Sequence, residues 1–144
     1  MILNKAELSD IPAILALEKK CFSHPYIASL IEASISNPQN FVLVVKDGEK
    51  TVGYAEFGNF IDAVFVNRIA TAPDMRRKGI ASLLLKEGEK MTAELGIYSI
   101  LLEVRSTNHA AAALYEKHGF KRIGIRRGYY SQPADDALIY KKQI

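Results

Sequence analysis

Tryptophan is absent from the sequence, and cysteine occurs once, as Cys21, in a chain of 144 residues. One cysteine cannot form a disulfide within the chain, and no CxxC pair or cluster of cysteine and histidine offers a metal site. The strongest run of large apolar residues, Phe41 to Val45, is far shorter than the roughly 20 residues that span a bilayer. These absences predict a cytoplasmic protein with no metal and no membrane association.

The sequence also lacks a strong excess of one charge. Nineteen basic residues against 16 acidic ones give a formal net charge of +3, too small to indicate nucleic acid. Aromatic residues interleaved with basic ones on a strand platform, which an RNA-binding domain would need, are not found. The hydrophobic content of 49% and the length fit one globular domain over residues 1–144.

The apolar periodicity predicts an alternation of strands and helices. Ser9 is the expected N-cap of a first helix, and an Asp-Gly dipeptide predicts a hairpin within FVLVVKDGEKTVGYAEF. Further helices are expected over about residues 27–36, 79–95 and 108–119, and further strands over 61–71, 98–104, 121–127 and 137–141. The order is β-α-α-β-β-β-α-β-α-β-β. It predicts an α/β fold in which helices flank a mostly antiparallel mixed sheet, with parallel neighbours across the helix at 79–95.

The stretch PDMRRKGIASLLL places Arg76, Arg77 and Lys78 directly before a helix start. A helix N-terminus carries partial positive charge, so each exposed cation there costs roughly 0.3–1 kcal/mol. Free amides, a glycine that permits close approach, and flanking cations together favour a bound phosphate. Neither GxxxxGK[ST] nor GxGxxG is present, and a solvated basic turn is the alternative interpretation.

In its pattern Arg76-x-x-Gly79-x-Ala81 the chain resembles the Q/R-x-x-G-x-G/A pyrophosphate loop of the GCN5-related N-acetyltransferases (GNAT). LEVRSTNHAAAALYEKHGF followed by IRRGYY resembles the RimI branch, which acetylates the N-terminal alanine of a small-subunit ribosomal protein. The resemblance implies the GNAT (acyl-CoA N-acyltransferase) fold and acetyl-CoA as co-substrate, with its pyrophosphate facing the basic loop.

The resemblance also implies which residues contact acetyl-CoA. The backbone of Ile69-Ala70-Thr71 would pair with the pantetheine arm, and a backbone N–H there, that of Ala70, would bind the thioester oxygen. Ordinary sheet pairing is the alternative for this segment. The cofactor-binding residues implied by the family are Ile69, Ala70, Thr71, Arg76, Arg77, Lys78, Gly79, Ile80, Ala81, Asn108 and Tyr115.

Glu103 is the candidate general base. It lies late in the strand YSILLEV between two apolar residues, where desolvation raises the pKa of a carboxylate toward a useful range. An ion pair with Arg105, two positions on and on the same face, is the alternative. The match to LEVR in the family favours the catalytic role.

Tyr115 is the candidate acid that donates a hydrogen bond to the departing thiolate. It lies seven positions after Asn108, on the same helical face, with Ala111 and Ala112 leaving room between them. A half-buried packing role for Tyr115 is the alternative. Asn108 is expected both to cap the helix and, by the resemblance, to contact the cofactor.

The acceptor is less strongly indicated. Arg126, Arg127, Tyr129 and Tyr130 resemble a RimI-type loop near the acceptor, and Asp135 and Asp136 would meet a basic peptide; a solvated turn and an exposed strand start are the alternatives. Phe22, His24, Pro25 and Tyr26 occupy the place of the family's F-x-x-P-W segment. Two residues depart from the family pattern: Tyr26 replaces Trp, and Arg68 replaces a usual Asn.

We therefore predict direct acetyl transfer to a protein N-terminal α-amine, that of a ribosomal protein, by a monomer or weak dimer with no direct nucleic-acid contact. An α-amino group has a pKa near 7.7–8.0 against about 10.4 for lysine, so a single weak base suffices for it. A GNAT enzyme that acetylates lysine or a small amine is one alternative. A non-catalytic acetyl-CoA-binding regulator is the other.

Overall fold

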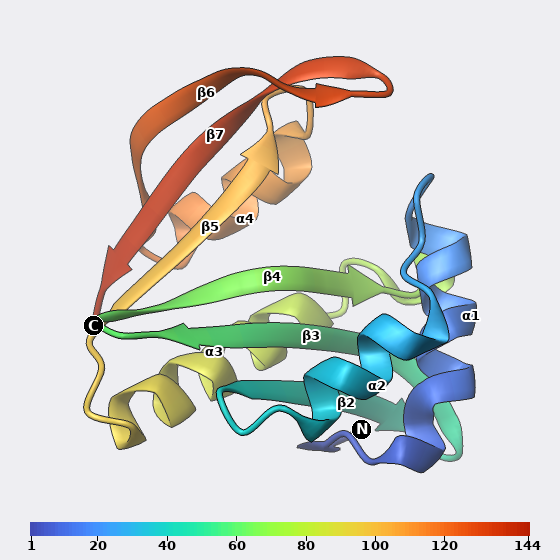
Figure 1. Ribbon diagram of the computed structural model, residues 1–144. Coiled ribbons are helices and arrows are strands. Elements are labelled where there is room, and N and C mark those ends of the chain that lie inside the picture. Colours follow the sequence, from blue (N-terminus) through green and yellow to red (C-terminus); the bar gives the residue numbers. More distant parts are fainter. The chain divides into compact units, whose positions relative to one another are not determined.

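The computed structural model describes residues 1–144 (Figure 1). Its strands and helices follow the predicted order, with two short 3-10 turns added. No helix is long and apolar enough to cross a membrane. The elements are β1 (Ile2–Lys5), η1 (Leu8–Asp10), α1 (Ile11–Cys21), α2 (Ala28–Ser36), β2 (Asn40–Asp47), β3 (Lys50–Phe60), β4 (Ala63–Thr71), η2 (Pro73–Met75), α3 (Ile80–Glu94), β5 (Ser99–Arg105), α4 (His109–Lys117), β6 (Lys121–Ser131) and β7 (Ala134–Gln143).

The seven strands have the order β1-β2-β3-β4-β5-β7-β6. β4 and β5, which α3 connects, run parallel, whereas β1–β2, β2–β3, β5–β7 and β6–β7 are antiparallel. The predicted hairpin is confirmed, because Asp47 faces Lys50 and Gly48 adopts a positive φ of 63° in the turn. The prediction of a mostly antiparallel sheet with parallel neighbours across the helix is confirmed as well.

The chain forms two compact units. Unit 1 contains Met1–Asn59 and Asn67–Gly88, and unit 2 contains Phe60–Val66 and Glu89–Ile144. The division passes through β4 and α3, so each unit holds part of both elements. The residues of the predicted site are also divided: the basic loop belongs to unit 1, whereas Glu103 and Tyr115 belong to unit 2.

In unit 1, helices cover both faces of the strands. Ile14 of α1 and Ile31 of α2 belong to one buried cluster with Tyr54 of β3, so these two helices cover the same face (Figure 1). The start of α3 packs on the opposite face at Gly53, where an added Cβ would lie 2.6 Å from the Ile80 side chain. A glycine at this position therefore permits the close approach of helix and strand.

In unit 2, α4 packs against the strands through aromatic side chains. The ring of Tyr115 lies 5.8 Å from that of Phe120 and 6.5 Å from that of Tyr140 on β7. Leu102 and Val104 of β5 are buried, and β5 lies between β4 and β7 in the sheet. Tyr115, the candidate acid, therefore also packs α4 against the strands.

Two predictions of local structure were wrong. Ser9 does not cap α1, because it lies in η1 and the helix begins only at Ile11, after Asp10. The Asp10 carboxylate instead accepts the Glu7 N–H at 2.8 Å and pairs with Lys46 at 2.9 Å. The last two strands are also longer than the expected 121–127 and 137–141, because β6 continues past Gly128, which has φ of 63°, and pairs with β7 as far as Ser131.

Candidate active site

The basic loop precedes α3 as predicted, and its cations have no partners among the carboxylates of the chain. Arg76, Arg77 and Lys78 are exposed, and none of them forms an ion pair. The nearby Asp74 pairs with Lys50 at 3.4 Å instead. The unfavourable interaction of three cations with the helix N-terminus is therefore not offset within the protein, and an external anion would offset it.

The backbone of this loop is strained where the anion would lie. Arg77 has φ of 65° and is the only residue other than glycine with positive φ; Gly79 has φ of 81°. A side-chain residue in the left-handed region costs roughly 1–2 kcal/mol. Turns that contain left-handed residues can direct successive backbone N–H groups toward one side, where an anion binds. The first backbone hydrogen bond of the helix joins the Leu83 N–H to the Gly79 carbonyl at 3.0 Å, so the amides of Ile80 and Ala81 have no intrahelical acceptors.

The predicted pantetheine-binding segment forms the end of β4. Ala70 is buried, and Ile69 and Thr71 are half-buried. The Thr71 carbonyl accepts a hydrogen bond from the Cys21 thiol at 3.3 Å. Cys21 therefore has a structural contact at the end of α1.

Glu103 lies on β5 and pairs with an arginine, but not with the expected one. Its Oε1 lies 3.1 Å from Nε of Arg126 on β6, and its side chain is about 20% exposed. Arg105 instead donates to the Pro133 carbonyl at 2.8 Å, and its guanidinium lies 4.1 Å from the centre of the Tyr130 ring. The alternative of a Glu103–Arg105 pair was therefore wrong, because Arg105 is engaged by the β6–β7 turn. The half-buried Glu103 carboxylate remains accessible to a proton donor.

Tyr115 is 6% exposed on the inner face of α4. Burial, with a smaller contribution from the Tyr130 phenol, raises the pKa of Tyr115 to about 12. No hydrogen bond from the Tyr115 hydroxyl to the chain is formed, and no fully buried side-chain oxygen lacks a partner. The hydroxyl is therefore the part of this residue that remains accessible. It is a neutral hydrogen-bond donor over the whole physiological pH range.

Asn108 begins α4 as predicted. Its Oδ1 accepts the Ala111 N–H at 3.2 Å, which confirms the N-cap. The adjoining residues of β7 hold the preceding turn: Asp135 accepts hydrogen bonds from the Ser106 and Thr107 hydroxyls, the latter at 2.7 Å. These hydrogen bonds, that from Ser106 first, lower the pKa of Asp135 to about 2.

The charged residues of the β6–β7 hairpin have partners within the chain. Asp136 accepts the Gly128 N–H at 2.8 Å and lies 3.8 Å from the Arg127 guanidinium. Together with Asp135, this means that both aspartates predicted to meet a basic peptide have partners within the chain. The rings of Tyr129 and Tyr130 meet edge to face at 5.1 Å, and Tyr129 is exposed.

A buried charge cluster in unit 1 was missed by the sequence analysis. Glu18 of α1 is fully buried and accepts hydrogen bonds from the Arg68 guanidinium, the Tyr26 N–H and the Tyr54 hydroxyl. Burial alone would raise the pKa of Glu18, but these donors outweigh it and hold that pKa below its usual value. The sequence could have indicated this cluster, because Glu18 is an acidic residue among the apolar residues of α1 and directly follows the buried Leu17.

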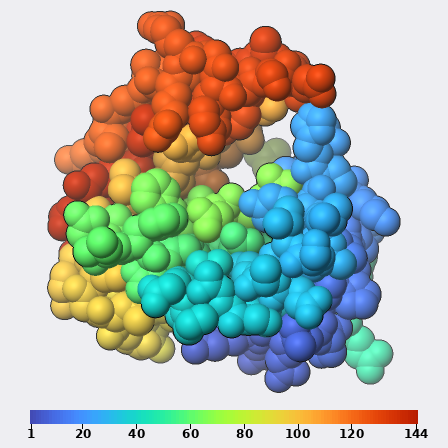
Figure 2. All heavy atoms as spheres, viewed as in Figure 1, coloured from blue at the N-terminus to red at the C-terminus, as the bar shows by residue number.

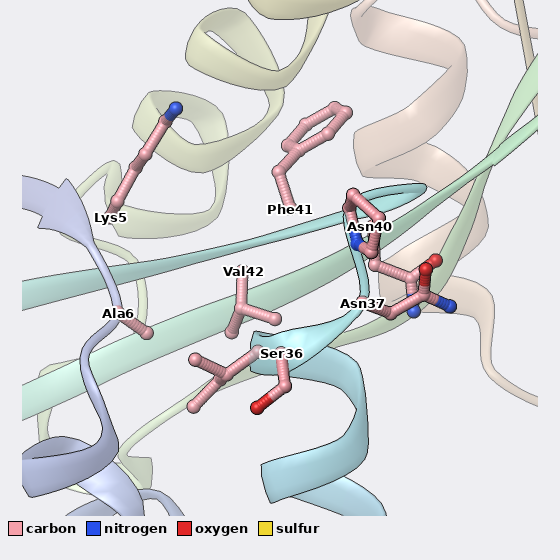
Figure 3. Close-up of a pocket in the computed structure, with 9 residues that line it drawn as sticks. Lys5, Ala6, Ser36, Asn37, Asn40, Phe41 and Val42 are labelled. Atoms are coloured by element: carbon pink, nitrogen blue, oxygen red, sulfur yellow. The ribbon is translucent and has the colours of Figure 1, made fainter.

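Two pockets of the structure lie away from the predicted site residues. The pocket in Figure 3 has a volume of about 280 Å³ and lies in unit 1, where Lys5, Asn37 and Phe41 contribute to its lining. A second, of about 260 Å³, is lined by residues of unit 2 that include Lys121 and Lys141. No group of three or more histidine, cysteine or acidic side chains could hold a metal ion.

Comparison with known proteins identifies the class. Residues 11–120 match the profile of the acetyltransferase (GNAT) family. The chain is 30% identical over 139 residues, 95% of its length and 93% of the relative, to the [ribosomal protein bS18]-alanine N-acetyltransferase of Escherichia coli K12. It is 35% identical over 115 residues to an N-alpha-acetyltransferase of Saccharolobus solfataricus, which covers 79% of this chain and 59% of that protein.

Solved structures agree with the sequence relatives. The crystal structure of the ribosomal-protein-S18-alanine N-acetyltransferase from Escherichia coli matches with a TM-score of 0.91 at 28% identity, over 99% of this chain and 93% of that one. The chain belongs to the acetyltransferase (GNAT) family and has the GNAT fold. It is an N-acetyltransferase.

Proposed function

We propose that this enzyme transfers the acetyl group of acetyl-CoA directly to the N-terminal alanine of a small-subunit ribosomal protein of the bS18 type. The observation that carries the proposal is the 30% identity, over 95% of the chain, to proteins named for this reaction. Transfer to a lysine side chain or a small amine is not favoured by these relatives. The same similarity supports one catalytic domain over residues 1–144, because the family match includes residues of both units. The similarity to these enzymes also supports action in the cytoplasm.

The basic loop supports acetyl-CoA as the co-substrate. The diphosphate would lie on the backbone amides of Lys78 to Ala81, with Arg76 and Arg77 neutralising its charge. The three unpaired cations and the left-handed backbone at Arg77 support this placement. Backbone groups of Ile69, Ala70 and Thr71 would align the pantetheine arm, and the Ala70 N–H would bind the thioester oxygen. When bound, the thioester supplies an activated acetyl group.

Glu103 would accept the proton of the attacking amine. An N-terminal α-amine with a pKa near 8 costs about 1 kcal/mol to deprotonate at pH 7, whereas lysine costs about 3.5 kcal/mol more. A carboxylate that is one-fifth exposed can accept this proton directly or through water. Its partner Arg126 is more than half exposed and can turn toward solvent when Glu103 changes its charge.

Tyr115 would stabilise the departing thiolate. Its pKa of about 12 lies about 3.5 units above that of a free thiol, so complete proton transfer to the thiolate is uphill by roughly 5 kcal/mol. A hydrogen bond from the phenol to the sulfur is therefore the main contribution, and solvent completes the protonation. Asn108, at the start of the same helix, would contact the cofactor.

Mass spectrometry of candidate acceptors tests the proposal. The enzyme is incubated with acetyl-CoA and three substrates: a peptide beginning with Ala-Arg, its N-terminally blocked analogue with an internal lysine, and a polyamine. We expect acetylation of the first alone, at its α-amine. Turnover of only the second or third would overturn the assigned acceptor. Binding of acetyl-CoA without turnover of any amine would favour a regulator.

A further inference from the structure

Arg68 forms the centre of a charge and ring cluster that joins α1 to β4 in unit 1. Its Nε and NH2 donate to the two carboxylate oxygens of Glu18 at 3.1 and 2.8 Å. NH2 also donates to the backbone carbonyl of His24 at 3.1 Å. The planar guanidinium thus binds the side chain of one helix and the main chain of the segment that follows it.

Two aromatic rings sandwich the same guanidinium. The Arg68 Cζ lies 3.7 Å from the centre of the Phe22 ring and 4.1 Å from that of the Tyr26 ring. Arginine stacks on ring faces while its edge donates hydrogen bonds, and lysine cannot reproduce both contacts. The phenol of Tyr26 is not needed for the stacking. The ring faces of two residues are therefore fixed by one side chain.

These contacts fix the α1–α2 connection, residues 22–27, beside the proposed thioester strand. Tyr26 N–H donates to Glu18 at 2.7 Å, and Cys21 at the start of the connection donates to Thr71. Arg68 directly precedes Ile69, so the two anchors lie on β4 at either end of the proposed pantetheine-binding segment. Between the anchors, residues 23–25 are exposed, and the connection projects from the rest of unit 1 in light blue (Figures 1 and 2).

We propose that Arg68 is a positioning residue for the acceptor: it acts through Glu18, Phe22 and Tyr26 to hold the α1–α2 connection as a wall beside Ile69-Ala70-Thr71. This proposal rests on the proposed function, in which the acetyl group lies at that strand. An attacking amine must be held within about 3.5 Å of the acetyl carbon in a defined direction. A wall held by a buried carboxylate and a bidentate arginine is rigid enough to provide this orientation.

A structural role alone would lower the amount of folded enzyme and therefore the apparent kcat, and it would leave both KM values unchanged. A wall for the acceptor predicts a selective effect. Releasing the connection weakens acceptor binding and leaves the diphosphate site at the start of α3 unchanged. The ratio of the acceptor KM to the acetyl-CoA KM, measured on folded protein, separates the two possibilities.

The test compares four variants: Arg68→Lys, Tyr26→Leu, Tyr26→Phe and Lys46→Met. We expect the first two to lower kcat/KM for the acceptor at least tenfold, the range of a desolvated cation–π contact, through a higher acceptor KM and a lower kcat, while the acetyl-CoA KM stays within about twofold. Tyr26→Phe keeps the ring and should behave like the unmodified enzyme. Lys46→Met is the matched control, because it breaks an ion pair to the buried Asp10 elsewhere in unit 1.

Amide exchange of residues 22–27 supplies a readout that needs no acceptor. We expect faster exchange of this segment in Arg68→Lys and Tyr26→Leu, and no change in Tyr26→Phe or Lys46→Met. Unchanged exchange in Arg68→Lys, or equal increases in the acceptor and acetyl-CoA KM values, would overturn the proposal. If the unmodified enzyme acetylates a different amine, the proposed function is wrong. The ratio of acceptor KM to acetyl-CoA KM, measured with that amine, still tests the role of Arg68.

Discussion

Two Arg-Arg pairs followed by a glycine occur in this chain, and their surroundings differ. Arg76-Arg77 lies in unit 1, with Lys78 between it and Gly79, and has no carboxylate partner. Arg126-Arg127 lies in unit 2 before Gly128, and its guanidinium groups pair with Glu103 and Asp136. Both glycines have positive φ, but one precedes a helix and the other lies within a strand.

The difference shows what a basic pair can indicate. Cations that are neutralised within the chain need no ligand, so the pair Arg126-Arg127 by itself does not indicate a bound anion. Cations left unpaired beside a helix N-terminus are destabilising until an anion binds, so the first pair points to one. Composition alone does not separate the two pairs. The two pairs differ because a helix follows the first pair and because the first pair has no acidic partner.

The largest effect is expected from the carboxylate beside the second pair. Glu103→Gln removes the general base while keeping the side-chain size, and kcat should fall roughly 100- to 1,000-fold at pH 7. Glu94→Gln, at the C-terminal end of α3, is the matched control and should leave kcat unchanged. Steady-state kinetics with the acceptor peptide measures both. A loss below about threefold would remove Glu103 from the catalytic role.

Substituting each arginine pair tests whether only the first pair binds the diphosphate. Arg76→Ala with Arg77→Ala removes two charge-assisted contacts to the diphosphate and should raise the acetyl-CoA KM roughly 10- to 100-fold. Arg126→Ala with Arg127→Ala should leave the acetyl-CoA KM within about twofold. Equal effects of the two double substitutions would show that the distinction between the pairs is wrong.

Tyr115→Phe should reduce kcat roughly tenfold, the contribution of one hydrogen bond to a charged sulfur. Because the pKa of Tyr115 is raised to about 12, its phenol stays protonated as the pH rises from 8 to 10. Deprotonation of this donor should therefore cause no decline in kcat over that interval. A decline that disappears in Tyr115→Phe would contradict the assignment.

The smallest effect concerns the start of α4. Asn108→Ala removes the cap on the Ala111 N–H and should lower the free energy of unfolding by about 1 kcal/mol. Asn108→Asp retains a capping oxygen, so it should preserve stability while its charge weakens acetyl-CoA binding. Thermal unfolding and the acetyl-CoA KM separate the two roles. Unchanged acetyl-CoA binding in both variants would leave Asn108 as a cap alone.

The sequence predicted the order of elements because apolar periodicity and turn residues are local. The Asp47-Gly48 hairpin and the Asn108 cap each depend on neighbours within a few positions. Ser9 was misplaced because a 3-10 turn and a helix share capping chemistry. At Gly128 the backbone bends without leaving the strand, and only the pairing with β7 shows this.

The contacts of the candidate site were harder to predict because they join distant parts of the chain. Arg68 and Glu18 are 50 residues apart, and Glu103 selects Arg126 over the nearer Arg105. The tyrosine-for-tryptophan and arginine-for-asparagine departures from the family pattern were noted separately in the sequence. In the structure Tyr26 and Arg68 are in contact, so the two departures form one feature.

Calorimetric titration with coenzyme A and with pantetheine, which lacks the diphosphate, tests the central claim most directly. The account predicts that coenzyme A binds at least tenfold more tightly than pantetheine, and that Arg76→Ala with Arg77→Ala removes most of this difference. No heat on addition of coenzyme A, or equal affinity of the unmodified enzyme for both compounds, would contradict it.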